Sequence, residues 1–151
     1  MIGRLDELNQ LERFYNSSKF EFLTMYGRRR IGKTTILREF AGRHKALFFS
    51  AQEKNDSLNL LDFSKMVQTF FEGSFISSFQ NWEAAFEYIT GKISDKKLVL
   101  IIDEFPFLAE PNPSIKSILQ HTIDHVWKGK NIFLILCGSN VSFMLNDVMG
   151  Y

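Results

Sequence analysis

Residues 22–42 read FLTMYGRRRIGKTTILREFAG, and this segment determines how the rest of the chain is interpreted. A short apolar run ends at Tyr26, residues 27–34 match the pattern G-x-x-x-x-G-K-[ST], and a helical pattern follows that we expect to end near Gly42. The two glycines allow backbone angles that let successive N–H groups surround phosphate oxygens, and the helix start adds the positive end of its dipole. The segment therefore predicts a strand, a phosphate-binding loop and a helix.

The side chains of this loop are assigned by the same chemistry. We expect Lys33 to place its charge on the β- and γ-phosphates of a nucleotide and the hydroxyl of Thr34 to ligate Mg²⁺. The expected nucleotide-binding residues are Gly27, Arg28, Arg29, Arg30, Ile31, Gly32, Lys33, Thr34 and Thr35. Two alternatives stay open: the segment could be a basic turn without a ligand, and the three arginines could be solvated or contact a neighbouring subunit.

Strands and helices alternate along the rest of the chain. The expected strands are 22–26, 46–50, 98–102 and 132–136. The expected helices are 4–17, 32–42, 60–70, 82–93, 113–128 and 141–148, with Gly73 ending the third and Asn112 capping the fifth. Uniformly apolar strands are typical of a parallel sheet covered on both faces. We therefore predict an α/β fold, a three-layer sandwich with a mostly parallel sheet of four strands and a fifth strand beyond this chain.

An apolar strand that ends in two carboxylates is the second candidate for function. Leu98–Ile102 is followed by Asp103 and Glu104. Because ligands of open parallel sheets lie beyond the carboxyl ends of the strands, we expect Asp103 to face the metal held by Thr34, directly or through water. Glu104 would accept a proton from, or orient, the water that attacks the γ-phosphate. An acidic strand end alone is usually structural, and the phosphate-binding loop is what favours function here.

Two polar residues, Ser139 and Asn140, follow the last expected strand. Beside the phosphate site, either could hold the γ-phosphate or the attacking water. Both residue types also cap helices well, so a structural role is the alternative.

Composition narrows the class of protein. The chain has 151 residues, 45% of them hydrophobic, and its 18 basic and 17 acidic residues leave a net charge of +1. A protein that binds nucleic acid mainly by its charge would have a larger basic excess. A single cysteine, Cys137, indicates a reducing compartment, and no apolar run is long enough for a signal peptide or a membrane span. We expect a cytoplasmic domain.

Three other features favour structural roles. Cys137 ends an apolar strand and is expected to pack as a small hydrophobic residue. His121 and His125 share a helix face, but Thr122 stands where a zinc peptidase needs glutamate, so solvated histidines are expected. Among the 16 phenylalanines, Phe63, Phe70 and Phe86 fall at core positions of the expected helices.

Together these motifs resemble the archaeal-type ATPase branch of the P-loop NTPases, which is related to the STAND signalling ATPases and to AAA+ proteins. The resemblance is carried by Ile2-Gly3-Arg4, Tyr26–Thr35, Ile102–Phe105 and Cys137–Asn140, with Met144 and Tyr151 after them. Leu5 departs from the pattern, because the family usually has a glutamate there.

The resemblance implies ATP as the nucleotide, Asp103 in the Walker B role and Glu104 as the hydrolytic base. Ser139 or Asn140 would sense the γ-phosphate, and Gly3 and Arg4 would lie near the adenine or shape the nucleotide pocket. It also implies that residues 1–151 are the N-terminal part of an ATPase domain, followed by a helical lid, a winged helix and sometimes an effector domain. Those parts or a neighbouring subunit would supply an arginine, and nucleic acid would be contacted only through them.

The leading function is Mg²⁺-dependent ATP binding and hydrolysis that couples nucleotide state to a conformational change, slow in this chain alone. A nucleotide-gated interaction switch with little turnover is the alternative. A small-molecule kinase is less favoured, because no arginine follows His44 to form a lid. A GTPase is disfavoured because no N-K-x-D motif is present and Pro106 replaces the glycine of D-x-x-G.

Overall fold

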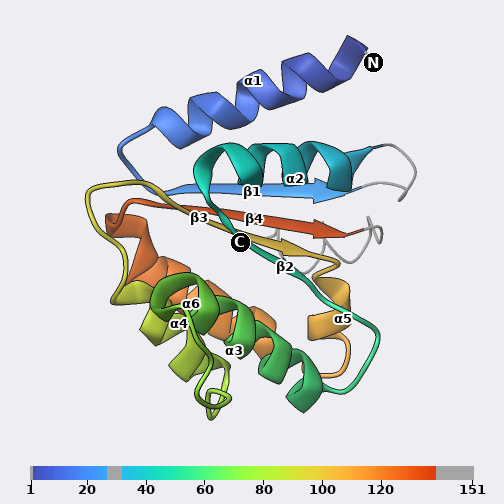
Figure 1. Cartoon of the computed structure of the whole chain (residues 1–151), viewed down its shortest axis with the longest axis vertical. Helices are drawn as coiled ribbons and strands as arrows, with labels where there is room; N and C mark the ends of the chain where they lie inside the picture. The colour runs from blue at the N-terminus through green and yellow to red at the C-terminus, as the bar shows by residue number, and fades with distance from the viewer. Residues whose placement is uncertain (1, 27–31, 139–151) are drawn as a thin grey trace.

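The structure is a computed structural model that describes residues 2–26 and 32–138. Its elements are α1 (Ile2–Asn16), β1 (Glu21–Tyr26), α2 (Lys33–His44), β2 (Leu47–Ser50), α3 (Asp56–Glu72), α4 (Trp82–Thr90), β3 (Leu98–Asp103), α5 (Pro106–Ala109), α6 (Ser114–His125), the 3-10 helix η2 (Trp127–Gly129) and β4 (Ile132–Gly138). Figure 1 shows three layers, with α1 and α2 on one side of the sheet and α3, α4 and α6 on the other.

The sheet has four described strands in the order β1-β4-β3-β2, and every neighbouring pair is parallel. Across the sheet, Leu23 lies opposite Ile135, Ile135 opposite Ile101, and Ile101 opposite Phe48. Parallel pairing places all carboxyl ends at one edge of the sheet, here called the carboxyl edge, and all amino ends at the other, the amino edge (Figure 1). The predicted α/β fold with a parallel sheet and helices on both faces is confirmed.

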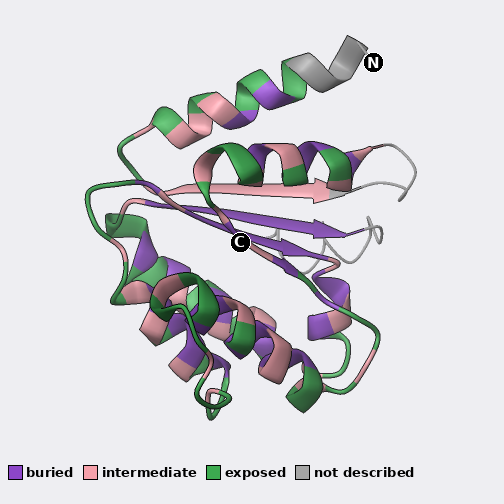
Figure 2. Ribbon diagram, in the orientation of Figure 1, coloured by how far each residue is buried: buried purple, intermediate pink, exposed green. Residues whose placement is uncertain are grey.

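Apolar side chains fill the space on both faces of the sheet, because successive strand residues point to opposite faces. Figure 2 shows β3 and β4 buried along most of their length. The cluster on the α1–α2 face is Leu8, Leu11, Ile36, Leu37, Phe40, Val99, Ile101, Phe133, Ile135 and Cys137. The cluster on the other face joins α3, α4, α5 and α6 to Leu100, Ile102, Leu134 and Leu136. The uniformly apolar strands are thus explained by burial on both sides.

The predicted end of the second helix at Gly42 is wrong. α2 continues to His44 and ends at Lys45, whose backbone is left-handed with φ 52°. Glycine inside a helix costs only about 1 kcal/mol, and tertiary contacts of the last turn outweigh it. The ring of His44 stacks on Tyr15 with centroids 3.7 Å apart, and its Nε2 lies 2.8 Å from a carboxylate oxygen of Glu12.

The predicted helix 113–128 is shorter and is followed by a separate turn. α6 ends at His125, and Val126 leaves helical geometry with φ −131° before η2 begins. The break places Trp127 in the core, where its side chain is fully buried and its indole Nε1 donates a 2.8 Å hydrogen bond to the hydroxyl of Thr90. Asn112 does not cap the helix; its amide donates to Asp56 Oδ1 at 3.2 Å.

Two further differences concern the elements around α3 and α4. Phe70 is 41% exposed, so its predicted core position is wrong. The last buried residue of α3 is Gln68, whose side-chain amide donates to Ser77 O and accepts from Ile76 N in the following loop. Phe71, rather than Phe70, packs against the core in the last turn. α4 stops at Thr90, before Ile93. The turn after β3 contains the short helix α5, which the sequence pattern did not predict.

None of the helices described within residues 2–26 and 32–138 combines the length and apolarity that crossing a bilayer requires.

Candidate active site

Two segments that are far apart in the sequence meet at the carboxyl edge. Thr34 lies in the first turn of α2, and Asp103 is the last residue of β3. The hydroxyl of Thr34 donates a 3.1 Å hydrogen bond to Oδ2 of Asp103 across 69 positions of sequence. The predicted proximity of the loop threonine and the acidic strand end is therefore confirmed.

The start of α2 has the geometry of an anion site. Gly32 is its N-cap residue, with φ 82° and ψ 8°, a left-handed conformation that glycine adopts without steric cost. No side chain at the N-cap accepts a hydrogen bond from the first N–H groups of the helix. These groups and the positive end of the helix dipole favour a negative charge at this position.

Lys33 follows at the first position of α2 and is buried, with 4% of its surface exposed. Its ammonium Nζ has no hydrogen-bond partner among the residues that the structure describes. Burial of an unpaired charge costs several kcal/mol, and an anionic ligand would offset that cost. Lys33 is thus the strongest sign that this part of the protein accommodates a ligand.

Asp103 is held at both carboxylate oxygens. Oδ2 accepts from Thr34, while Oδ1 accepts from the backbone N–H of Glu104 at 3.0 Å and from the thiol of Cys137 at 3.3 Å. Cys137 is fully buried, as predicted for a small hydrophobic residue, but its contact with Asp103 was missed. Burial is the main cause that raises the pKa of the Cys137 thiol, and the Asp103 charge raises it further, so the thiol stays protonated.

Glu104 turns the chain sharply out of β3. Its backbone is left-handed with φ 57°, a conformation that non-glycine residues adopt at a cost. The next residue, Phe105, is buried and its N–H donates to Cys137 O at 2.9 Å. Phe105 therefore anchors the turn in the core, and the backbone conformation of Glu104 is a feature that no sequence pattern indicated.

Several predicted site residues lie outside the described residues: Gly27, Arg28, Arg29, Arg30, Ile31, Ser139 and Asn140, together with the expected helix 141–148. Thr35 is exposed in the first turn of α2. Gly3 and Arg4 lie in the first turn of α1.

The described part of the site fits a nucleoside triphosphate accompanied by Mg²⁺. The buried ammonium of Lys33 favours an anionic partner, and the start of α2, where Gly32 offers no side-chain cap, favours the same charge. The hydroxyl of Thr34 and the carboxylate of Asp103 are oxygen ligands of the kind that Mg²⁺ takes.

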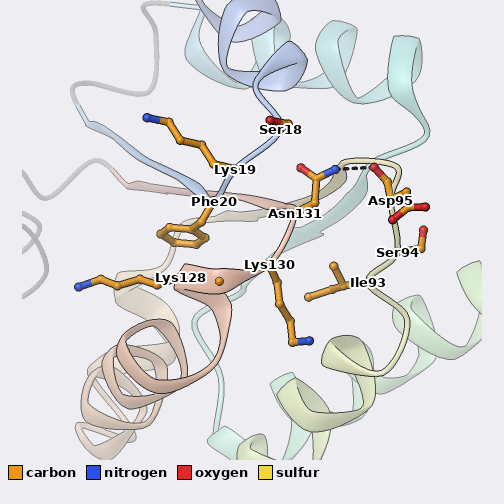
Figure 3. A pocket seen from close by; sticks show the side chains of 10 residues that line it. Ser18, Lys19, Phe20, Ile93, Ser94, Asp95, Lys128, Lys130 and Asn131 are labelled. Atoms are coloured by element: carbon orange, nitrogen blue, oxygen red, sulfur yellow. Dashed lines mark hydrogen bonds between the residues drawn. The ribbon is translucent and has the colours of Figure 1, made fainter.

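A hollow of about 700 Å³ lies at the opposite, amino edge (Figure 3). It is lined by Ser18, Lys19, Phe20, Ile93, Ser94, Asp95, Lys128, Gly129, Lys130 and Asn131. Figure 3 shows the three lysine side chains pointing in different directions, while Asn131 Nδ2 donates a 2.6 Å hydrogen bond to Asp95 O. The charged groups of this hollow do not converge on one point, whereas Thr34 and Asp103 meet at the carboxyl edge.

His121 and His125 are exposed and lie beside each other, with ring centroids 4.3 Å apart. Within residues 2–26 and 32–138, no three histidine, cysteine, aspartate or glutamate side chains gather into a group that could hold a metal ion.

Comparison with protein families and curated proteins gives two matches that cover nearly the whole chain. A family model described as an ATPase domain predominantly from Archaea matches residues 1–150. An uncharacterized protein of Methanocaldococcus jannaschii is 32% identical over 150 residues, which are 99% of this chain and 32% of that protein. An uncharacterized ATP-binding protein of the same organism is 41% identical over 44 residues, 29% of this chain and 75% of that protein.

Solved structures share the fold at low sequence identity. Cdc6p from Pyrobaculum aerophilum matches with a TM-score of 0.63 and 20% identity, over 95% of this chain and 40% of Cdc6p. The ORC1 protein of Aeropyrum pernix, solved in complex with DNA, matches with a TM-score of 0.59 and 15% identity, over 97% of this chain and 41% of ORC1. The chain thus spans about a third of its long M. jannaschii relative and two fifths of these structural neighbours.

Proposed function

The chain belongs to the ATPase domain family found predominantly in Archaea, and on this premise we propose that it binds ATP with Mg²⁺, hydrolyses it and changes conformation with the state of the nucleotide. The observation that carries the proposal is the buried ammonium of Lys33, which has no partner among the described residues and lies next to the Thr34–Asp103 hydrogen bond. A triphosphate supplies the negative charge that this lysine lacks, and it does so beside two oxygen ligands for Mg²⁺.

In this proposal each binding residue has a distinct task. Residues 27–35 would surround the phosphates with backbone N–H groups, and Lys33 would place its charge on the β- and γ-phosphates. Thr34 and Asp103 would hold Mg²⁺, which, when bound, neutralises charge on the phosphate oxygens. Ser139 and Asn140 would sense the γ-phosphate from the end of β4.

Glu104 is the proposed base. The oxygen of a water molecule attacks the γ-phosphorus, the bond from this phosphorus to the β–γ bridging oxygen breaks, and ADP and phosphate form. Glu104 accepts or orients the proton of the attacking water. Its place directly after Asp103 supports this role, because the two carboxylates then share one turn at the carboxyl edge.

Hydrolysis by this chain alone is expected to be slow. An arginine supplied from outside raises the turnover of related NTPases by roughly 10³–10⁵, and no arginine follows Arg43 in this chain. We propose that a neighbouring subunit or a later domain supplies it. Any contact with DNA, as in the ORC1 complex, would likewise be made outside residues 1–151, because a net charge of +1 provides no basic excess.

Calorimetric titration tests the proposal directly. We expect ATP to bind more tightly with Mg²⁺ than with a chelator, and GTP to bind more weakly than ATP. Absence of ATP binding under both conditions would overturn the proposal. Single-turnover measurement of ADP then separates the alternatives: a nucleotide-gated switch binds ATP without forming ADP, and a kinase forms ADP only when an acceptor is present.

A further inference from the structure

Cys137 is the single cysteine of the chain, and we propose that it is a positioning residue that fixes the carboxylate of Asp103 in its working orientation. The inference rests on the proposed function, because Asp103 matters here as a ligand of Mg²⁺. Cys137 lies near the end of β4, the strand that separates β1 from β3 in the sheet.

The thiol has two acceptors within reach but only one proton. Sγ lies 3.3 Å from Asp103 Oδ1 and 3.7 Å from Ile102 O. The carboxylate oxygen is both closer and charged, and hydrogen bonds to charged acceptors are the stronger ones. Cys137 is fully buried, so water does not compete for either partner.

The main chain of Cys137 makes a second link to the same turn. Cys137 O accepts from Phe105 N at 2.9 Å. The side chain therefore holds the residue before Glu104, and the main chain holds the residue after it. This double link from β4 keeps the left-handed turn at Glu104 in place between two fixed points.

These contacts restrict rotation of the Asp103 carboxylate. Oδ1 is occupied by the Cys137 thiol and the Glu104 N–H, which leaves Oδ2 on the side of Thr34. Rotation of the carboxylate would break all of these bonds at once. Removing the thiol loosens this arrangement, so Asp103 is less prepared to bind Mg²⁺ when the nucleotide arrives.

The hydrogen bond itself is measurable without nucleotide. Because the chain has one cysteine, its S–H stretching band in the infrared comes from Cys137 alone. We expect this band at the lowered frequency of a donor thiol, and we expect Asp103→Leu to move it upward because the charged acceptor is lost. A wild-type band at the frequency of a free thiol, or one that does not respond to Asp103→Leu, would overturn the inference.

The effect on Mg²⁺ is measured by titrating the metal against a fluorescent ATP analogue bound to the protein. We expect Cys137→Ala to raise the midpoint of this titration, the Mg²⁺ concentration that gives half of the fluorescence change, about three- to ten-fold. This is the effect of losing one hydrogen bond. Affinity for the analogue without Mg²⁺ should not change. Cys137→Ser keeps a hydrogen-bond donor and should restore the wild-type midpoint. Ile135→Val is the control for packing, because it removes a methylene group from the same buried face of β4 without touching Asp103.

Other outcomes have distinct meanings. If Cys137→Ser is impaired as much as Cys137→Ala, or if Ile135→Val shifts the midpoint equally, packing explains the effect and the inference is wrong. If Cys137→Ala does not fold, the volume-matched pair Cys137→Thr and Cys137→Val decides the same question, because only threonine carries a donor. A wild-type protein that binds no analogue refutes the proposed function, whereas the S–H band still tests the contact.

Discussion

Each edge of the sheet has a buried lysine, and the two lysines differ in the hydrogen-bond partner of their ammonium group. At the amino edge, Lys97 is 7% exposed and its ammonium donates to the backbone carbonyl of Lys19. At the carboxyl edge, Lys33 is 4% exposed and its ammonium has no partner in the part of the chain that the structure describes. Burial lowers the pKa of Lys97, and the charge of Glu21 partly opposes this shift.

The arrangement of charges, rather than their number, distinguishes the candidate binding site at the carboxyl edge from the structural contact at the amino edge. The amino edge has more lysines, but Lys97 has a backbone partner and Lys128 pairs with Asp124 at 3.3 Å. At the carboxyl edge, Lys33 has no hydrogen-bond partner within residues 2–26 and 32–138 and lies beside the Thr34–Asp103 hydrogen bond. A buried charge with a protein partner has a hydrogen bond within the fold, whereas one without a partner favours a ligand.

Exchanging each buried lysine for methionine is the strongest test of this comparison. We expect Lys33→Met to abolish detectable ATP binding, because it removes the main positive charge for the phosphates. The same change removes an unpaired buried charge, so the free energy of unfolding should stay equal or rise. Calorimetry and denaturant titration measure the two quantities.

Lys97→Met is the matched control for that substitution. It should leave ATP affinity unchanged and lower the free energy of unfolding by about 1–3 kcal/mol, because Lys19 O loses its buried donor. Equal loss of ATP binding in both variants would show that the two lysines do not differ in function.

Glu104→Gln tests the second carboxylate of the carboxyl edge. We expect ATP affinity to be kept, because glutamine has the same shape, while single-turnover hydrolysis falls by about 10²–10⁴, the usual contribution of a general base. Asp95→Asn, at the amino edge, should change neither quantity, because the Asn131 contact uses Asp95 O of the main chain. Wild-type turnover in Glu104→Gln would remove Glu104 from the base role.

Two threonines with long-range hydrogen bonds give a third pair. Thr34→Val removes the hydroxyl that bonds Asp103, so the Mg²⁺ requirement for nucleotide binding should rise about 10–100-fold. Thr90→Val removes the acceptor of the buried Trp127 indole and should cost about 1–3 kcal/mol of unfolding free energy without affecting Mg²⁺. Mg²⁺ titration should therefore separate Thr34→Val from the wild type, and thermal denaturation should separate Thr90→Val from it.

The proximity of Thr34 and Asp103 was predictable from sequence because two independent rules agree. The motif predicts a metal-binding hydroxyl at Thr34, and the apolar strand before Asp103 predicts that its carboxylate lies at the same edge of a parallel sheet. Neither rule requires knowledge of how the strands are ordered. The strands themselves were predictable because uniformly apolar runs are buried on both faces.

The role of Cys137 was not predictable in the same way. Its thiol reaches Asp103 only because β4 lies next to β3, and strand order is a property of the whole sheet. Local patterns failed for a related reason at Gly42 and at Phe70. The helix passes Gly42 because of contacts that His44 makes with α1. Phe70 is exposed because its neighbour Phe71 takes the position that packs against the core.

The smallest expected effect comes from two left-handed residues, Lys45 and Glu104, with φ 52° and 57°. Lys45 ends α2, the helix that leads back to the amino edge, and Glu104 turns the chain at the carboxyl edge. Glycine has no steric penalty in this conformation, and relief of that penalty stabilises the folded state. Glycine is also more flexible in the unfolded chain, which offsets part of this gain. Each change to glycine should therefore raise the free energy of unfolding by only about 0.5–1 kcal/mol.

The two glycine variants should differ in turnover. Lys45→Gly should hydrolyse ATP as the wild type does, because a helix end needs only its backbone shape. Glu104→Gly should be as slow as Glu104→Gln although it is more stable, because the residue is kept in a strained conformation for its carboxylate. Lys45→Ala is the control that keeps the strain and should not gain stability. If Glu104→Gly is less stable than the wild type, the side chain of Glu104 contributes to the fold, and the contrast between the two left-handed residues is lost.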